Sequence, residues 1–474
     1  MATLNSALQI MTGALTADQA ALNVTSNNIA NASTPGYTRE APVFQSNDVV
    51  TINGISYGQG VQMTSAQSQR SLILEAGIQQ QSQAQQASNS EWMAMQQVQS
   101  IFNQVTTASG AGTNGLGDQI TGFFNSLTQL EASPASITLR ENVLSAAGSM
   151  TSAFNNVAQQ LGQQTTTLNQ QVQGVVGQIN PLLTSIAQLN QQITASSPNG
   201  DASQFEDQRQ YDLQQLSQYI GVNVVQTESN GLTVTTTGGA LLVSKDQAFQ
   251  LSTGNVGGHL HVFTGAPGLP QDITTQQADG GGQLAGLLAA RDQDIPAIRS
   301  QADTLAYHVS TSVNINQSNG VDLNGNPPQQ FFNGNGPGNI PGAAAAVKVR
   351  ITSPFQIAAA SPGNGPGDGT NLQAMANVAN QGVVAGDTPA DYYSSFVAGL
   401  GSQVAGLNTQ NQAQQASLSQ VQSQRNALSA VSLDEEAANL QTYERAYQSA
   451  SRVFSILDTL MSTTLNLGLE TPMA

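Results

Sequence analysis

The 474-residue chain contains no cysteine, and only 9% of its residues are charged, against about 25% in an average soluble domain. The absence of cysteine excludes disulfides, thiol nucleophiles and thiolate metal ligands. Lysine and arginine number 12 against 29 acidic residues, and this net charge of −17 argues against nucleic-acid binding, which depends on neutralising phosphates. No run of about 18 apolar residues occurs, so we expect no membrane span.

The start of the chain, MATLNSALQIMTG, lacks the basic and apolar regions of a cleavable secretory signal. Apolar side chains then recur every seven positions through the first thirty residues. The two rows consist of Leu4, Leu8, Met11, Leu15, Leu22 and Ile29. This spacing predicts an amphipathic helix about 40 Å long with a coiled-coil seam. Pro35 and Gly36 are expected to end it.

The middle of the chain changes its period twice. Residues 37–65 are predicted to be extended, and helices are predicted over 68–108, 120–130 and 136–195. Pro181 should kink the last of these helices or remove one of its hydrogen bonds.

Short β-favouring runs follow at 222–225, 232–237, 240–243 and 259–263, with a hairpin turn expected at Asn230-Gly231. A helix over 283–316, a strand at 347–351 and a glutamine-rich helix over 389–428 complete the central pattern.

The last helix repeats the pattern of the first. Its predicted seam consists of Leu433, Leu440, Tyr447, Phe454, Leu457 and Met461. Ser432 is its expected N-cap, followed by acidic residues in the first turn. A lone terminal helix can bury an apolar stripe only against the other terminus or another subunit. We therefore expect both termini to make subunit contacts.

Few residues suggest chemistry. His259 and His261 share one face of a predicted strand, but no third metal ligand is identifiable. The string DLNGNP at 322–327 resembles the start of a calcium loop but lacks the final glutamate. No nucleophile elbow, Walker loop or HExxH string occurs. We therefore expect no catalytic residues, no metal site and no cofactor.

Two terminal strings carry a family resemblance. TSNNIANASTPGYTR at 25–39 resembles the N-terminal signature of flagellar rod, hook and hook-associated subunits, and its PGYTR ending is most similar to the hook-associated protein 1 family. SLDEEAANLQTYERAYQSASRVFSILDTLMSTTLNLG at 432–468 resembles the C-terminal domain of the same family.

The resemblance implies a non-enzymatic structural subunit of the bacterial flagellum at the hook–filament junction, with a mainly α fold and a β-rich central insert. The expected nesting has a terminal coiled-coil domain (1–35 and 429–474), a long-helix rod domain (36–204, 281–330 and 372–428) and an outer β-rich domain (205–280 and 331–371).

Expected partners follow from the same resemblance. They are further copies in a ring, the hook protein below, and a second junction protein or filament subunits above. The resemblance also implies type III export without a cleaved signal, an export chaperone at the C-terminus, and an extracellular location.

The matching positions suggest roles for the motif residues Asn27, Asn28, Asn31, Pro35, Gly36 and Tyr37. The asparagines would satisfy free backbone groups at the helix end, and the Pro-Gly-Tyr segment would set the exit angle of the chain. One row of the first helix would pack against Leu433, Leu440, Tyr447 and Phe454. Both terminal segments would be largely disordered before assembly and fold on docking.

Two alternatives stay open from the sequence. A hook or distal-rod protein shares the N-terminal signature but does not account for PGYTR, LDEEAANL or the long heptad helix. A secreted coiled-coil adhesin accounts for the lysine-poor surface but not for the paired terminal motifs.

Overall fold

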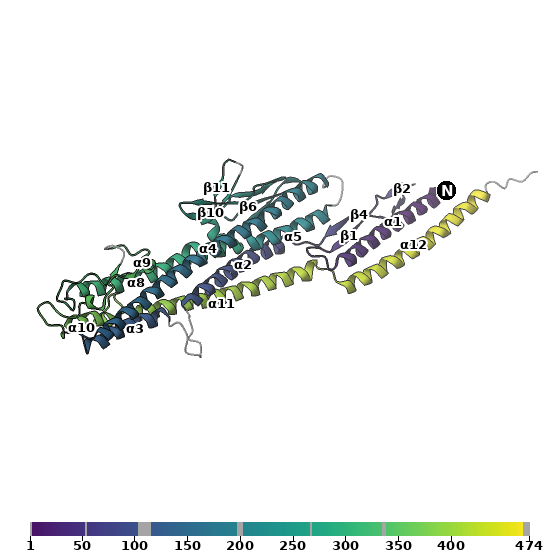
Figure 1. Cartoon of the computed structure of the whole chain (residues 1–474). Helices are drawn as coiled ribbons and strands as arrows, with labels where there is room; N and C mark the ends of the chain where they lie inside the picture. Colours follow the sequence, from purple (N-terminus) through teal and green to yellow (C-terminus); the bar gives the residue numbers. More distant parts are fainter. Residues whose placement is uncertain are drawn as a thin grey trace, which may run out of the picture.

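The computed structural model describes residues 2–52, 55–102, 115–196, 202–265, 268–333 and 338–467. The molecule is elongated, with the start of the first helix and the end of the last helix at one tip and the helices of the middle of the chain extending toward the other (Figure 1). The end of the helix predicted over 68–108, from residue 103 on, lies outside the described residues. The architecture is mainly α with small antiparallel sheets, as the sequence predicts.

The terminal part contains two long helices and an arm of short strands. The helices are α1 (Ala2–Asn31) and α12 (Leu433–Leu467), which pack against each other. The arm consists of β1 (Glu40–Ser46), β2 (Val50–Ile52), β3 (Ile55–Tyr57) and β4 (Val61–Ser68), with β1 paired to β4 and β2 to β3. Residues 40–68 were assigned by sequence to the rod domain, but β1 and β4 pack on α1.

The central part is a bundle of long helices. Its main members are α2 (Leu72–Phe102), α3 (Leu116–Glu131), α4 (Ile137–Ser196), α5 (Ser203–Tyr219) and α11 (Pro389–Ser429). The shorter α7 (Gly282–Ala289) continues through a π-helical turn (Ala290–Asp294) into α8 (Ile295–Ser318). Buried aromatic and aliphatic side chains such as Met95, Phe123 and Phe154 form the core.

Pro181 does not interrupt α4, which runs as one helix of 60 residues. The neighbouring Asn180 uses its side chain instead to hold the outer part of the molecule. Its Nδ2 donates to the carbonyl of Leu251 at 2.9 Å, and its Oδ1 accepts from the Leu251 amide at 2.8 Å.

The outer part contains two antiparallel sheets packed along α4 (Figure 1). One has the order β5 (Val222–Gln226), β6 (Leu232–Thr236), β7 (Leu241–Ser244) and β8 (Gln247–Ala248). The other has β10 (His259–Thr264) between β9 (Ser252–Val256) and β11 (Gln271–Asp272). The hairpin expected at Asn230-Gly231 is confirmed, since β5 and β6 pair in antiparallel register with Val222 opposite Thr236.

The segment 331–371 does not join this outer part, which corrects the predicted domain grouping. Asn155 of α4 donates to the carbonyl of Ala344 at 2.8 Å, whereas Asn180 contacts the outer sheets. These positions on α4 are separated by about 38 Å at 1.5 Å per residue. Its two-residue strands at Phe332–Asn333 and Lys348–Val349 pair with each other, and the segment packs on α4 and α8.

The remaining short elements connect these parts. They are α6 (Thr274–Ala278), α9 (Ala343–Ala346), α10 (Thr370–Asn377), the strands β12 (Phe332–Asn333) and β13 (Lys348–Val349), and 3-10 turns at Glu228–Asn230, Pro354–Gln356 and Val378–Asn380.

Candidate assembly surface

The terminal helices run antiparallel, so the start of α1 lies beside the end of α12 (Figure 1). All six predicted residues of the N-terminal seam are half-buried, and none is fully covered: Leu4, Leu8, Met11, Leu15, Leu22 and Ile29. The fully buried residues are the smaller or polar ones beside them: Ala17, Ala21, Val24, Thr25 and Asn28. Small side chains at these positions let the neighbouring backbones approach α1 closely.

The predicted C-terminal seam divides between covered and uncovered positions. Leu440, Phe454, Leu457 and Met461 are half-buried. Leu433 is 56% exposed and Tyr447 is 36% exposed. A strict seven-residue row drifts around a straight helix by about 20° per heptad. Leu433 therefore lies at the edge of the contact with α1, whereas Tyr447 stands between two half-buried members of the row and its exposure is not explained by this drift.

A second apolar face of α12 has no partner within the described part of the chain. It consists of Val453, Ile456 and Leu460, three to seven residues apart and therefore on one side of the helix. Ile456 is 60% exposed. Because an exposed row of large aliphatic side chains indicates an interaction site, we call these three residues the outer α12 face.

The motif residue Asn28 lies at the centre of a buried polar cluster between the two helices. Its Nδ2 donates to Glu436 Oε2 at 3.1 Å and to the Glu40 carbonyl at 2.8 Å. Its Oδ1 accepts from the Tyr37 hydroxyl at 2.8 Å and from the Glu40 amide at 3.0 Å. Arg39 Nε donates to Glu436 Oε1 at 2.7 Å. We call Asn28, Arg39 and Glu436 the joint cluster.

The joint cluster is electrostatically balanced. Burial alone would lower the pKa of the Arg39 guanidinium, but the hydrogen bond and charge of Glu436, together with Glu435, outweigh burial and raise that pKa. The Arg39 amide also donates to the carbonyl of Ser429 at 3.0 Å. The cluster therefore joins the chain leaving α1 to the chain entering α12.

The other two motif asparagines lie on the exposed side of the helix end. Asn31 Nδ2 donates to Asn27 Oδ1 at 2.7 Å and to the Asn27 carbonyl at 3.1 Å, and Asn31 Oδ1 accepts from the Thr34 hydroxyl at 3.1 Å. These bonds connect the last turn of the helix to the following loop.

Gly36 turns the chain toward the helical bundle. Its φ is +81°, and a Cβ at this position would lie only 2.8 Å from Tyr211 Cβ on α5. Two residues on, the Thr38 amide donates to Asp207 Oδ2 at 3.0 Å, and Arg70 pairs with the same carboxylate. Burial raises the pKa of Asp207, although Arg70 and the Thr38 amide act against it. The motif thus contacts α5.

Sequence reasoning missed Glu436, Arg39, Asp207 and Tyr211. The first two belong to the strings that carry the family resemblance, so charged residues inside those strings were an available signal. Asp207 and Tyr211 offered none, because only folding brings α5 to the end of α1.

The strand arm lies along α1 and extends this surface. A Cβ on Gly13 would lie 3.2 Å from the carbonyl oxygen of Val61, and Gly60, with a φ of +83°, lies against Ile10. The Phe44 ring lies 6.1 Å from the Tyr443 ring of α12. The arm therefore contacts both terminal helices.

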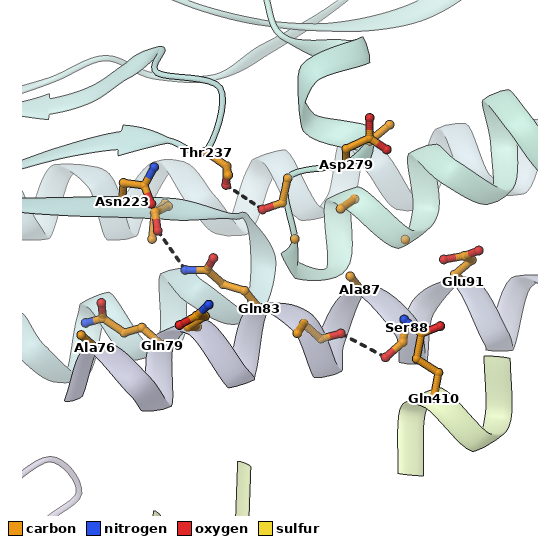
Figure 2. A pocket seen from close by; sticks show the side chains of 18 of the residues that line it. Ala76, Gln79, Gln83, Ala87, Ser88, Glu91, Asn223, Thr237, Asp279 and Gln410 are labelled. Carbon is orange, nitrogen blue, oxygen red and sulfur yellow. Dashed lines mark hydrogen bonds between the residues drawn. The ribbon is translucent and has the colours of Figure 1, made fainter. Parts of the chain in front are cut away.

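A cavity of about 680 Å³ lies between α2, β5 and α11 (Figure 2). Its lining is rich in glutamine and alanine, and Gln83 Nε2 donates to the carbonyl of Val222 at 3.0 Å. Burial, and then the charge of Asp294, raise the pKa of Glu91 to about 7. The cavity offers the two carboxyl groups of Glu91 and Asp279, and the Gln83 amide in its lining is already bonded to the backbone, which suits packing better than chemistry.

His261 Nδ1 lies 2.6 Å from Asp272 Oδ2, so this ring pairs with a carboxylate. Among the described residues, no three side chains that commonly ligate metals come together. Among all the residues that the structure describes, no helix is long and apolar enough to cross a membrane.

Comparisons with known proteins give the same assignment along the chain. A family model described as the helical domain of flagellar hook-associated protein FlgK matches residues 95–332, just over half of the chain. Models of the flagella basal body rod protein and of the flagellar basal body rod FlgEFG protein C-terminal region match 8–38 and 422–467.

Flagellar hook-associated protein 1 of Bacillus subtilis is 26% identical, covering 96% of both chains. Its namesake from Salmonella typhimurium is 24% identical, covering 96% of this chain and 98% of the relative. The structure of the flagellar hook junction protein FlgK from Burkholderia pseudomallei has the same fold, with a TM-score of 0.65 and 20% identity over 76% of this chain and all of that one. With more than half of its length matched by the helical-domain model, the chain belongs to the flagellar hook-associated protein FlgK family.

Proposed function

We propose that the protein is a structural subunit of the bacterial flagellum that forms the junction between hook and filament. It assembles as a ring through its terminal helices, with hook protein below and a second junction protein or filament subunits above. Family membership supports this role, and the alternatives of a hook or distal-rod protein and of an adhesin are not favoured. The function involves no catalysis.

The single observation that carries the assembly mechanism is the outer α12 face. The helix packs against α1 on one side and exposes Val453, Ile456 and Leu460 on another. A neighbouring subunit covers this face in a ring, and because about half of each side chain is already covered, burying the rest contributes about 1 kcal/mol each. The terminal helices thereby form a continuous coiled coil around the flagellar axis, and their folding is completed on docking.

The subunit reaches this place by type III export without a cleaved signal, and an export chaperone holds the exposed apolar C-terminal helix beforehand. An apolar helix face that is covered only after assembly is a liability in the cell, because such faces aggregate.

The test is electron microscopy of cells lacking the gene, with the culture medium probed for flagellin. We expect bare hooks and flagellin in the medium, and restoration of filaments by the unchanged gene. Absent hooks would favour the rod or hook alternative, and normal filaments would favour the adhesin.

A pair of variants separates assembly from folding. Ile456→Asp places a charge on the outer α12 face and should leave flagellin in the medium. Ser455→Asp adds the same charge at the adjacent exposed position, off that face, and should restore filaments. Equal behaviour of the two variants would contradict the role of the face.

A further inference from the structure

The apolar rows of the terminal helices leave their register poorly determined. On α1, Ala7, Ala14 and Ala21 repeat at seven-residue intervals, as does the leucine row beside them. If α1 slides by one heptad along α12, about 10 Å, each alanine of α1 moves into the place that the next alanine of its row held. Each leucine likewise moves into the place of the next leucine. Apolar packing therefore distinguishes weakly between the observed pairing and a slipped one.

The joint cluster breaks this repeat. Asn28 is fully buried, Glu436 is 1% exposed, and the two bond to each other across 408 residues of sequence. The row that contains Asn28 otherwise holds alanine at each earlier heptad, so a slip places Glu436 opposite Ala21. The carboxylate would then lose both Asn28 and Arg39 while it stays buried.

Losing the partners of a buried charge is costly, whereas the apolar contacts regained after a slip are nearly unchanged. A buried asparagine at one core position is an established way to specify register in coiled coils.

We infer that Asn28, Arg39 and Glu436 specify the register in which the terminal helices of this subunit pair. The inference concerns the helix pair on which the proposed assembly rests, but it applies to one chain alone. It assigns the buried motif asparagine a positioning role, distinct from that of the exposed Asn27 and the half-buried Asn31.

The absence of cysteine makes the register measurable by disulfide cross-linking. Counting in heptads from the Asn28–Glu436 contact along the antiparallel pair places Ala14 opposite Ala450. Ala450→Cys is combined in turn with Ala14→Cys for the observed register, and with Ala7→Cys or Ala21→Cys for the two slipped registers. The full-length chain is oxidised in the presence of sucrose, an osmolyte that is excluded from protein surfaces. The osmolyte favours burial of apolar side chains and so keeps the helices paired.

With the joint cluster intact, we expect cross-linking of the Ala14 pair to exceed that of either slipped pair by about 100-fold, the factor that corresponds to losing a buried ion partner. With Asn28→Leu and Glu436→Leu together, cross-linking should spread to the slipped pairs within about tenfold of the Ala14 pair while far-UV circular dichroism stays helical.

Two further variants keep the test decisive. Glu436→Leu alone leaves the bonds of Asn28 to Glu40 and Tyr37 in place and should also spread the cross-links. The matched control, Asn27→Leu with Glu444→Leu, changes the same residue types at exposed positions and should not.

Cross-linking that stays with the Ala14 pair in both cluster variants would overturn the inference. So would slipped cross-links, or none, when the cluster is intact. The assay needs no flagella, so loss of the junction role in cells would leave its result standing.

Discussion

Gly36 offers the sharpest test of how the motif joins the terminal helices to the bundle. Alanine there adopts a left-handed backbone at a φ of +81°, which costs about 1 kcal/mol relative to glycine. Its Cβ would also lie 2.8 Å from Tyr211 Cβ, and overpacking of this kind costs about 1–3 kcal/mol. Gly36→Ala should therefore destabilise the joint by about 2–4 kcal/mol.

Native-state hydrogen exchange is the suitable assay, because a chain of several parts does not unfold in one transition. The amides to follow are those of Thr38 and Arg39, which donate to Asp207 and Ser429. A loss of 2–4 kcal/mol corresponds to exchange that is faster by about 30- to 900-fold.

Gly325→Ala is the matched control. This glycine has a φ of +80° but nothing within 4 Å of an added Cβ, so only the backbone term applies. Exchange of neighbouring amides should rise about fivefold there, the equivalent of 1 kcal/mol. If Gly36→Ala accelerates exchange at the joint no more than this control does at its own site, the close approach to Tyr211 is refuted.

Three further predictions concern the bundle. Glu91 has a pKa of about 7 against an ordinary 4.5, so the folded chain holds an extra proton between these values and stability falls as pH rises through them. At pH 8, Glu91→Gln should slow the hydrogen exchange of the α2 amides near position 91, relative to the unchanged chain, by the equivalent of about 1–3 kcal/mol, and near pH 4 it should leave their exchange unchanged. Gly286→Ala would place a Cβ 2.1 Å from the carbonyl oxygen of Ala87, which overpacks the contact between α2 and α7 by about 1–3 kcal/mol. This variant should lower the urea midpoint of unfolding. Gly148→Ala, where an added Cβ meets open space, is the control and should not lower it. Arg140→Met should lower the stability of the bundle by about 3 kcal/mol or more, because the fully buried guanidinium donates to three backbone carbonyls that would lose their donor. Calorimetry measures the effect, and an unchanged melting temperature would contradict this prediction.

Periodicity was sufficient to predict the helices, because burying a stripe requires apolar residues at helical spacing whatever lies opposite. The 60-residue α4, the terminal helices and the β5–β6 hairpin all follow from local patterns in this way. Pro181 shows the limit of local rules, since a single missing hydrogen bond is too small to break a helix packed along most of its length.

The grouping of segments was less predictable. Residues 40–68 and 331–371 contain β-favouring runs that resemble those of the outer sheets, yet one packs on α1 and the other on α4 and α8. Strand propensity does not specify a partner, because the pairing of a strand depends on which surface the rest of the chain presents.

The sequence alone determined that both ends of the chain form amphipathic helices, that the surface is poor in charge, and that two motifs place the chain near the hook-associated proteins. Only the tertiary structure decided which residues meet. Asn28 and Glu436 are brought together by folding, Gly36 reaches Tyr211 through the turn of the chain, and the outer α12 face has no partner among the residues that the structure describes. These contacts depend on the relative placement of helices hundreds of residues apart, which no local pattern encodes.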